Sequence, residues 1–295
     1  MRYALLVALF ASVPVHAADA CSLFRDLKYG TTVSVELGLG DGSWWAKSLC
    51  NKRYTRNARG EWLSNDAWFA YLKLELPSNL SRKLSRLART IERVEKRGDY
   101  LYVTAEVTGT LRPLDPKWNQ AALAVSAIKG ITSNEQPAAS KLPVMSMCEL
   151  FKDLPVFNRK RVAVRGELGG NREGNWLVPT DKCTQRFVTK AYPWAFDLWF
   201  SGSGEIGLPA DDSSQSARSE RQNISGVFVG IVVLADQYIV QCRSGRLDGF
   251  GFGHLGESPG VFLTETVLNP VAGPPTYANR DEPVIPDCTE NAGSK

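Results

Sequence analysis

Apolar residues recur at every second position in several short segments of the chain, as expected of strands that bury one face. Pro77 ends the clearest of these segments. Its apolar face carries Trp68, Ala70, Leu72, Leu74 and Leu76. The alternation predicts three strands before residue 77 and two more near 100–109 and 121–131. In the second half of the chain it predicts strands near 161–169, 174–179, 193–200, 224–234 and 261–268.

One segment changes from the two-residue period to a helical one. Between residues 79 and 96 the apolar positions are three or four apart, at Leu80, Leu84, Leu87, Ile91 and Val94. Ser78 is a suitable N-cap for this helix, and Gly98 is a suitable residue to end it. The corresponding stretch of the second half, 201–223, is rich in Ser, Gly and Asp and predicts a mobile loop instead.

The two halves of the chain repeat the same ordered features, which indicates a tandem duplication. Residues 21–27 (CSLFRDL) recur as residues 148–154 (CELFKDL), and each copy is followed by a β-branched strand and then by Gly-x-Trp. A cysteine follows the tryptophan after six residues in the first copy and after seven in the second. Residues 68–72 (WFAYL) likewise have a counterpart in residues 194–198 (WAFDL).

The duplication also predicts how the six cysteines pair. Each repeat opens with one cysteine and has a second one after its Gly-x-Trp. The expected disulfides are therefore Cys21–Cys50, Cys148–Cys183 and, by subtraction, Cys242–Cys288. No two cysteines have the Cys-x-x-Cys spacing of a redox motif or a zinc knuckle, so structural bonds are favoured over reactive thiols.

Five strands with a helix between the third and the fourth follow the order of an OB-fold barrel. We therefore predict a mainly β protein of two tandem five-stranded OB-like barrels, with that helix in the first repeat. The second repeat also carries Cys148-Glu149-Leu150, the strand 162–166 (VAVRG), Cys183 and the turn 251–255 (GFGHL). With these residues it resembles a domain of exported bacterial proteins whose role is uncharacterised. The first repeat lacks the Gly-His-Leu element, and the resemblance implies no activity.

The start of the chain has the pattern of a signal peptide, with Arg2, an apolar run to Val13 and a Val-His-Ala cleavage pattern. Its removal leaves a net charge of about +3 on an ordinary globular composition. No later apolar run reaches the ~20 residues of a membrane-spanning helix. We expect a periplasmic or secreted bacterial protein with disulfide bonds. The predicted organisation is a signal peptide (1–17), a first OB-like domain (18–134), a linker (135–145), a second OB-like domain (146–269) and a Pro-rich tail (270–295).

Few residues offer catalytic or metal chemistry. His254 is the only histidine after residue 17, so a catalytic triad or a zinc site would have to use it. It lies in residues 251–256, which match G-x-G-x-x-G but are followed by Pro259 and β-branched residues instead of a helix. A glycine turn with a structural histidine is favoured, and a ligand contact by His254 is the alternative. We therefore assign no catalytic residue, no cofactor and no metal.

Two surface features are candidates for binding. The helix has a net charge of +5 over 16 residues, from Arg82, Lys83, Arg86, Arg89, Arg93, Lys96 and Arg97 against Glu92 and Glu95. A solvated helix face is favoured over a site for anions. Aromatic residues also occupy off-core positions, with Trp45 in the loop between the first two strands and Phe69, Tyr71 and Trp199 on strands. These rings could stack on bases or sugars, but packing between the repeats is favoured.

These patterns predict a non-enzymatic binding or interaction module of the bacterial cell envelope. Its affinity would come from aromatic and basic surfaces. The expected partner is a protein or an anionic envelope component, and nucleic acid is disfavoured because the basic helix lies away from the usual OB binding face. Two alternatives stay open: a hydrolase whose carboxylates the sequence does not reveal, and a polyanion or nucleic-acid binder whose affinity falls with salt.

Overall fold

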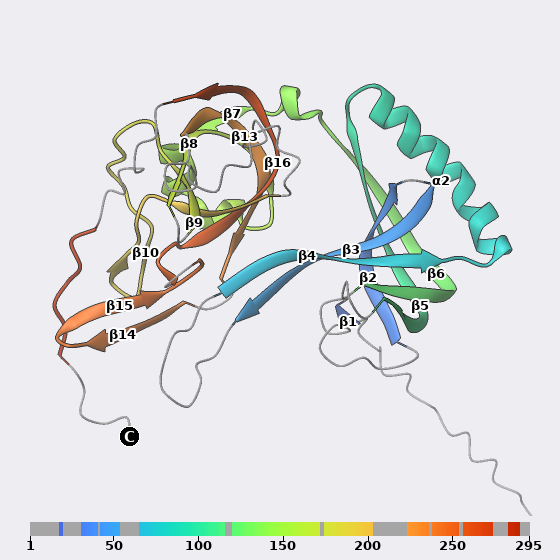
Figure 1. Cartoon of the computed structure of the whole chain (residues 1–295), viewed down its shortest axis with the longest axis horizontal. Helices are drawn as coiled ribbons and strands as arrows, with labels where there is room; N and C mark the ends of the chain where they lie inside the picture. Colours follow the sequence, from blue (N-terminus) through green and yellow to red (C-terminus); the bar gives the residue numbers. More distant parts are fainter. Residues whose placement is uncertain are drawn as a thin grey trace, which may run out of the picture. The chain divides into compact units, whose positions relative to one another are not determined.

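The computed structural model describes residues 18–19, 31–40, 42–53, 65–115, 120–171, 174–202, 223–235, 238–253, 256–273 and 283–289. The protein divides into two compact units, and its longer strands form two closed barrels (Figure 1). The first unit comprises the described residues within 1–48, 70–93 and 101–134, and the second comprises those within 49–69, 94–100 and 135–295. The predicted signal peptide and most of the predicted mobile loop lie outside the described residues.

The first barrel has the strand order predicted from the sequence. Its strands are β2 (Thr31–Gly40), β3 (Ser43–Arg53), β4 (Asn65–Glu75), β5 (Tyr100–Asp115) and β6 (Gln120–Gln136). They lie in the order β2-β3-β4-β6-β5, and β5 pairs with β2 to close the barrel. The third and fifth strands, β4 and β6, run parallel. This is the five-stranded barrel expected of an OB fold. A two-residue strand, β1 (Ala18–Asp19), pairs parallel with β2.

The predicted helix between the third and fourth strands is α2 (Ser78–Lys96). The Pro77 carbonyl accepts a hydrogen bond from the Ser81 amide, so Ser78 is the first helical residue and not the cap. Gly98, with φ +77°, ends the helix as predicted, and its amide donates to the Glu95 carbonyl at 2.8 Å. The fully buried side chains of α2 are Leu84, Ile91 and Val94.

The second barrel repeats the first. Its strands are β8 (Arg161–Asn171), β9 (Gly174–Val178), β12 (Leu198–Gly202), β13 (Ile224–Leu234) and β16 (Gly260–Ala272). They lie in the order β13-β16-β12-β9-β8, and β13 pairs with β8 to close the barrel. The third and fifth strands, β12 and β16, again run parallel. The shared strand order confirms the two OB-like barrels. The other short elements of this unit are β7 (Val144–Ser146), β10 (Val188–Thr189), β11 (Tyr192–Pro193), η1 (Ala139–Lys141) and η2 (Leu154–Phe157).

The third strand of the second barrel is shorter than the alternation predicts. The pattern predicts a strand over 193–200, but β12 begins only at Leu198. Trp194 is fully buried in an irregular segment, where its amide bonds to the Phe187 carbonyl and its indole donates to Thr189. Trp194 is apolar because it is buried, although it pairs with no strand. The apolar pattern therefore starts before β12 does.

The repeated cysteine motif is helical in the second unit, where it forms α3 (Met147–Lys152). Ser146 caps this helix by accepting from the Glu149 amide, while the Glu149 carboxylate accepts from the Ser146 amide. The backbone hydrogen bond from Ser146 holds the pKa of Glu149 below its usual range. Leu150 and Phe151 point into the barrel core, so the motif closes one side of that core.

Two of the three predicted disulfides are described in full. Cys148 of α3 bonds to Cys183, which confirms the pairing inferred from the duplication. Cys242 bonds to Cys288 and ties the C-terminal segment to the hairpin of β14 (Ile239–Arg243) and β15 (Arg246–Phe250). Cys50 is also disulfide-bonded, while its predicted partner, Cys21, lies outside the described residues.

The second unit has an apolar cluster in addition to its barrel core. Val233 of β13 and the two β16 residues Val261 and Leu263 are buried there together with Ala67 of β4. Leu49 of β3 packs against the same cluster. Residues 49–69 accordingly belong to the second compact unit, although β3 and β4 also contribute strands to the first barrel.

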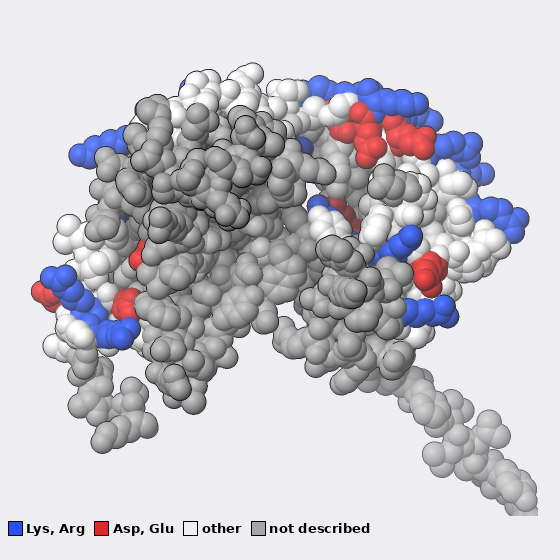
Figure 2. Space-filling model, viewed as in Figure 1, with Lys and Arg blue, Asp and Glu red and all other residues white. Residues whose placement is uncertain are grey.

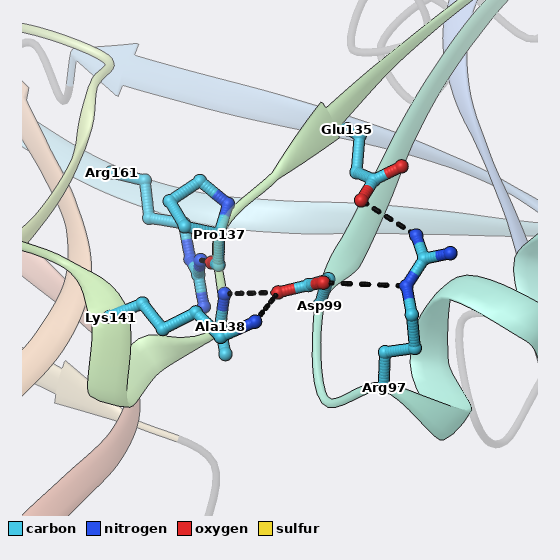
Figure 3. Close-up of polar contacts among 7 residues, drawn as sticks. All are labelled: Arg97, Asp99, Glu135, Pro137, Ala138, Lys141 and Arg161. Atoms are coloured by element: carbon cyan, nitrogen blue, oxygen red, sulfur yellow. Dashed lines mark hydrogen bonds and ion pairs between the residues drawn. The ribbon is translucent and has the colours of Figure 1, made fainter.

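A polar cluster surrounds Asp99, just after the end of α2 (Figure 3). Its Oδ1 accepts from Lys141 Nζ at 2.7 Å and from the Ala138 amide at 3.1 Å. The hydrogen bond from Lys141 is the main reason that the pKa of Asp99 lies below its usual range. Arg97 lies 3.6 Å from the other carboxylate oxygen and pairs with Glu135 at 2.7 Å. All of these residues belong to the second unit, where they fix part of the predicted linker beside the helix end.

Candidate functional site

Along the strands of the first unit, residues that point into the barrel alternate with residues that point outward. The buried positions are Val35 and Leu37 on β2, Trp44 and Ala46 on β3, and Leu72 and Leu74 on β4. Side chains of a strand alternate between the two faces, so the residues between these positions point outward. They are Glu36 and Gly38, Trp45 and Lys47, and Tyr71 and Lys73. We call this surface, together with Tyr102 on the adjoining β5, the outer aromatic face.

Trp45 is a strand residue of this face. The sequence interpretation that places it in a loop is wrong, because β3 begins at Ser43 and Trp45 pairs with Gly38 of β2. Only two residues connect Gly40 with Ser43, and Gly42 has φ +68° there. Asp-Gly sequences favour such tight hairpin turns. The short turn extends β3 and brings the indole onto the outer aromatic face.

Gly38 leaves open space beside the Trp45 indole. A Cβ atom placed on Gly38 would meet no described heavy atom within 4 Å. The φ of Gly38 is not positive, so its backbone conformation does not require glycine either. Neither packing nor backbone geometry in the described residues therefore explains the glycine. No described atom fills the space above the Gly38 backbone, next to Trp45 on the paired strand.

Glu36 lies close to two exposed tyrosines. Tyr71 on β4 and Tyr102 on β5 keep 51% and 40% of their surface exposed. Burial raises the pKa of both phenols, and the nearby negative charge of Glu36 raises both further. Only 11% of the Glu36 side chain is exposed, and its Oε1 lies 4.0 Å from Lys47 Nζ. A partly shielded carboxylate therefore lies near both rings of the outer aromatic face.

The outer aromatic face is suited to recognising a ligand. The rings of Trp45, Tyr71 and Tyr102 offer flat apolar surfaces with polar edges. The Glu36 carboxylate accepts hydrogen bonds and the Lys47 ammonium donates them. Among the residues that the structure describes, no group of three His, Cys, Asp or Glu could hold a metal ion. The face can stack a flat ligand and hydrogen-bond its polar groups.

Three residues of this face were missed by sequence reasoning. Tyr102 could have been found, because Leu101 and Val103 are apolar neighbours that leave it on the opposite parity of β5. Glu36 and Lys47 gave no such signal. Glu36 lies near Tyr71 and Tyr102, and Lys47 lies near Glu36, only because the barrel places β2, β3, β4 and β5 side by side.

Trp199 does not belong to the outer aromatic face. It packs in the second unit against Trp176 of β9, with ring centroids 5.6 Å apart and planes nearly perpendicular. Gly253 and Gly174 leave room for its ring, since a Cβ on Gly253 would come within 2.2 Å of it. This packing accounts for Trp199 without a ligand. The side chain of Phe69 and all of His254 lie outside the described residues.

The described glycines on either side of residues 254–255 lie close together, in agreement with the glycine turn that the sequence favours. The Gly251 amide donates to the Gly256 carbonyl, and Gly253 has φ +83°. The chain continues from Gly256 into strand β16 and not into the helix that a dinucleotide-binding G-x-G-x-x-G motif requires. Beside the turn, Ser258 donates a hydrogen bond to Asp197, and both side chains are buried. Sequence reasoning missed this pair, which lies in the interior of the second unit.

The basic residues of α2 form a second candidate surface. Arg82, Arg86, Arg89 and Arg93 are all exposed and lie at spacings of four, three and four residues. Such spacing places them on one face of the helix, which we call the arginine stripe. Figure 2 shows Lys and Arg side chains following the ridge of α2, with acidic side chains beside them. A shallow concavity at its N-terminal end is lined by Asn79, Arg82, Lys83 and Arg86.

Comparison with known proteins adds no information about function, so a function has to be inferred from the outer aromatic face and the arginine stripe. No family model, no curated protein and no solved structure matches the chain. Within the described residues, no helix is both long enough and apolar enough to cross a membrane.

Proposed function

We propose that the protein is an exported, non-enzymatic binding module of the bacterial cell envelope that holds a glycan on its outer aromatic face. The observation that carries the proposal is the grouping of Trp45, Tyr71 and Tyr102 around Glu36, next to the open backbone at Gly38. Aromatic rings stack on the apolar faces of sugars, while a carboxylate accepts hydrogen bonds from sugar hydroxyl groups. The negative charge of Glu36 disfavours a phosphate-rich ligand at this position.

The disulfide bonds of the second unit support export from the cytoplasm. Disulfides such as Cys148–Cys183 and Cys242–Cys288 persist in oxidising compartments outside the cytoplasm. The signal-peptide pattern of residues 1–17 and the resemblance to exported bacterial OB-like domains point the same way. A periplasmic or secreted location would bring the outer aromatic face into contact with envelope glycans.

The test is binding of the purified full chain to soluble oligosaccharides and peptidoglycan fragments, followed by tryptophan fluorescence and isothermal calorimetry. Trp45→Ala and Tyr71→Ala should each weaken binding by about 5–100-fold, the range expected for loss of one stacking ring. Val188→Ala, which truncates an exposed side chain of the second unit, is the control and should leave affinity unchanged. Absence of glycan binding, or binding that ignores both aromatic substitutions, would overturn the proposal.

One observation favours a hydrolase as the second candidate. Glu106 is exposed on the outer parity of β5, where it faces Ser34 while Glu36 faces Thr104. Diagonal neighbours on paired strands have Cα atoms about 7–8 Å apart, so the carboxyl groups of Glu36 and Glu106 can adopt the separation of about 6.5–9.5 Å that inverting glycosidases use. Release of new reducing ends from the glycan, abolished by Glu36→Gln or Glu106→Gln, would assign this activity. An intact glycan after prolonged incubation would favour binding alone.

A further inference from the structure

The arginine stripe carries a second inference, independent of the glycan proposal. Arg82, Arg86, Arg89 and Arg93 follow one another along about 16 Å of α2. All four side chains are exposed, and Lys83 flanks the first turn of the stripe. The helix buries Leu84 and Ile91 on its opposite side. The stripe is therefore the most outward part of α2.

These charges are not balanced by ion pairs in the described part of the chain. None of the four arginines lies within ion-pair distance of a described Asp or Glu, whereas Arg97 beyond the helix pairs with Glu135. Like charges three or four residues apart in a helix oppose its formation. The arginine stripe therefore destabilises its own helix, and an anionic partner would relieve the repulsion between the arginines.

The surroundings of the stripe narrow the kind of partner. The apolar face of α2 is already packed on the first barrel, so the helix has no free apolar side to insert into a partner. The stripe is a convex ridge, and the concavity lined by Asn79, Arg82, Lys83 and Arg86 covers only one end of it. A convex basic ridge touches a flat anionic surface along its whole length, whereas a flexible polyanion is held best in a groove.

We propose that the arginine stripe docks the protein on the phosphate headgroups of an anionic lipid bilayer. Guanidinium groups bind phosphate oxygens in a two-pronged geometry that ammonium groups lack, which agrees with the four arginines of the stripe. Adsorption is electrostatic, reversible and weakened by salt, because each basic residue near an anionic bilayer contributes a modest part of the affinity. The concavity at Asn79 seats one headgroup phosphate.

The experiment is co-sedimentation of the purified full chain with vesicles that contain phosphatidylglycerol, compared with vesicles of phosphatidylcholine alone. Binding is expected only to the anionic vesicles, and it should decrease as salt is raised. Each arginine removed should lower the partition coefficient about fivefold, so Arg86→Gln with Arg89→Gln should lower it about 25-fold. The control pair Lys129→Gln with Lys182→Gln removes the same charge from exposed positions outside α2 and should have a much smaller effect.

Circular dichroism of each variant confirms that the fold is intact before the vesicle measurement. Equal binding to both kinds of vesicle, no binding to either, or equal losses in the two variant pairs would overturn the proposal. Soluble polyphosphate provides the last arm. If the chain binds polyphosphate through the stripe but does not bind anionic vesicles, the partner is a soluble polyanion and not a membrane. Because Trp45 and Tyr71 take no part in this experiment, its failure leaves the glycan proposal standing.

Discussion

Replacing Arg86 with glutamate should make the protein more stable while it weakens membrane docking. Arg86 lies one helical turn from three other cations of α2, namely Arg82, Lys83 and Arg89, and all of these side chains are exposed. Among the described positions three or four residues away from Arg86, none is acidic. The substitution therefore converts three repulsive neighbours into attractive ones and adds no new repulsion within the helix.

The magnitude follows from measured helix pairs. A like-charge pair three or four residues apart costs about 0.2–0.5 kcal/mol, and an opposite-charge pair gains about the same. Three converted pairs should raise the free energy of unfolding by about 1–3 kcal/mol at low salt. Helix propensity adds little, since glutamate and arginine are nearly equal in this respect. The same substitution lowers the charge of the stripe by two units, which should lower vesicle binding about 25-fold.

The assay is urea denaturation at low and at high salt, followed by circular dichroism, with Arg86→Gln as the matched variant. The glutamine variant removes the repulsion without creating attraction, so about half of the stabilisation is expected. High salt should reduce both gains, because exposed charges are screened. Most substitutions that damage a protein lower both its stability and its binding. A variant that is more stable but binds vesicles more weakly would therefore show that the arginine stripe has the proposed role.

Two results would refute the reasoning. The first is an Arg86→Glu protein that is less stable than the wild type at low salt, which would mean that Arg86 already has a favourable partner. The second is a stabilisation that does not shrink as salt is raised, which would rule out relief of charge repulsion as its cause.

Three further predictions concern the second unit. Replacing Cys148 and Cys183 together by alanine opens a bond that spans 35 residues and should lower the free energy of unfolding by about 3–4 kcal/mol in urea denaturation; an unchanged midpoint would contradict this. Gly253→Ala should be more destabilising than Gly245→Ala in thermal unfolding, because both have positive φ but only the first would bring a Cβ within 2.2 Å of the Trp199 ring; equal losses would argue against the ring contact. Burial raises the pKa of Tyr238 far above its ordinary value, so the unfolded chain ionises first as the pH passes about 10 and stability is lost above that pH. Tyr238→Phe should make the decline of stability between pH 10 and 11.5 shallower by about 1.4 kcal/mol per pH unit, measured by urea midpoints; an identical slope would show that Tyr238 also loses its proton in the folded protein over this range, so that its pKa is not raised.

The barrels were predictable from local patterns. The two-residue alternation located the strands, because one side of each strand packs in a core and the other does not. The helical spacing from Leu80 to Val94 located α2, and Gly98 marked its end. The duplication paired Cys148 with Cys183, since equivalent positions in two copies of one fold must bond in the same way.

What lay beyond prediction was which outward side chains share a surface. Tyr71 and Trp199 have the same parity in their strands, yet Tyr71 is exposed while Trp199 packs against Trp176. Tyr71, Tyr102 and Glu36 come from three different strands and were brought to one place by sheet order. Alternation is a property of neighbouring residues, so it reports which face a residue takes but not what covers that face.

Trp45 is the one residue of the candidate site that the sequence placed in the wrong element. Trp45 was assigned to a loop because the sequence does not state how many residues a hairpin turn uses, and the register with Gly38 settles that number. The charge of the arginine stripe, by contrast, was determined by the sequence alone, since the spacing within one helix places Arg82, Arg86 and Arg89 on one face. Only the tertiary structure decided that this face points to solvent, because the opposite face of α2 packs on the barrel.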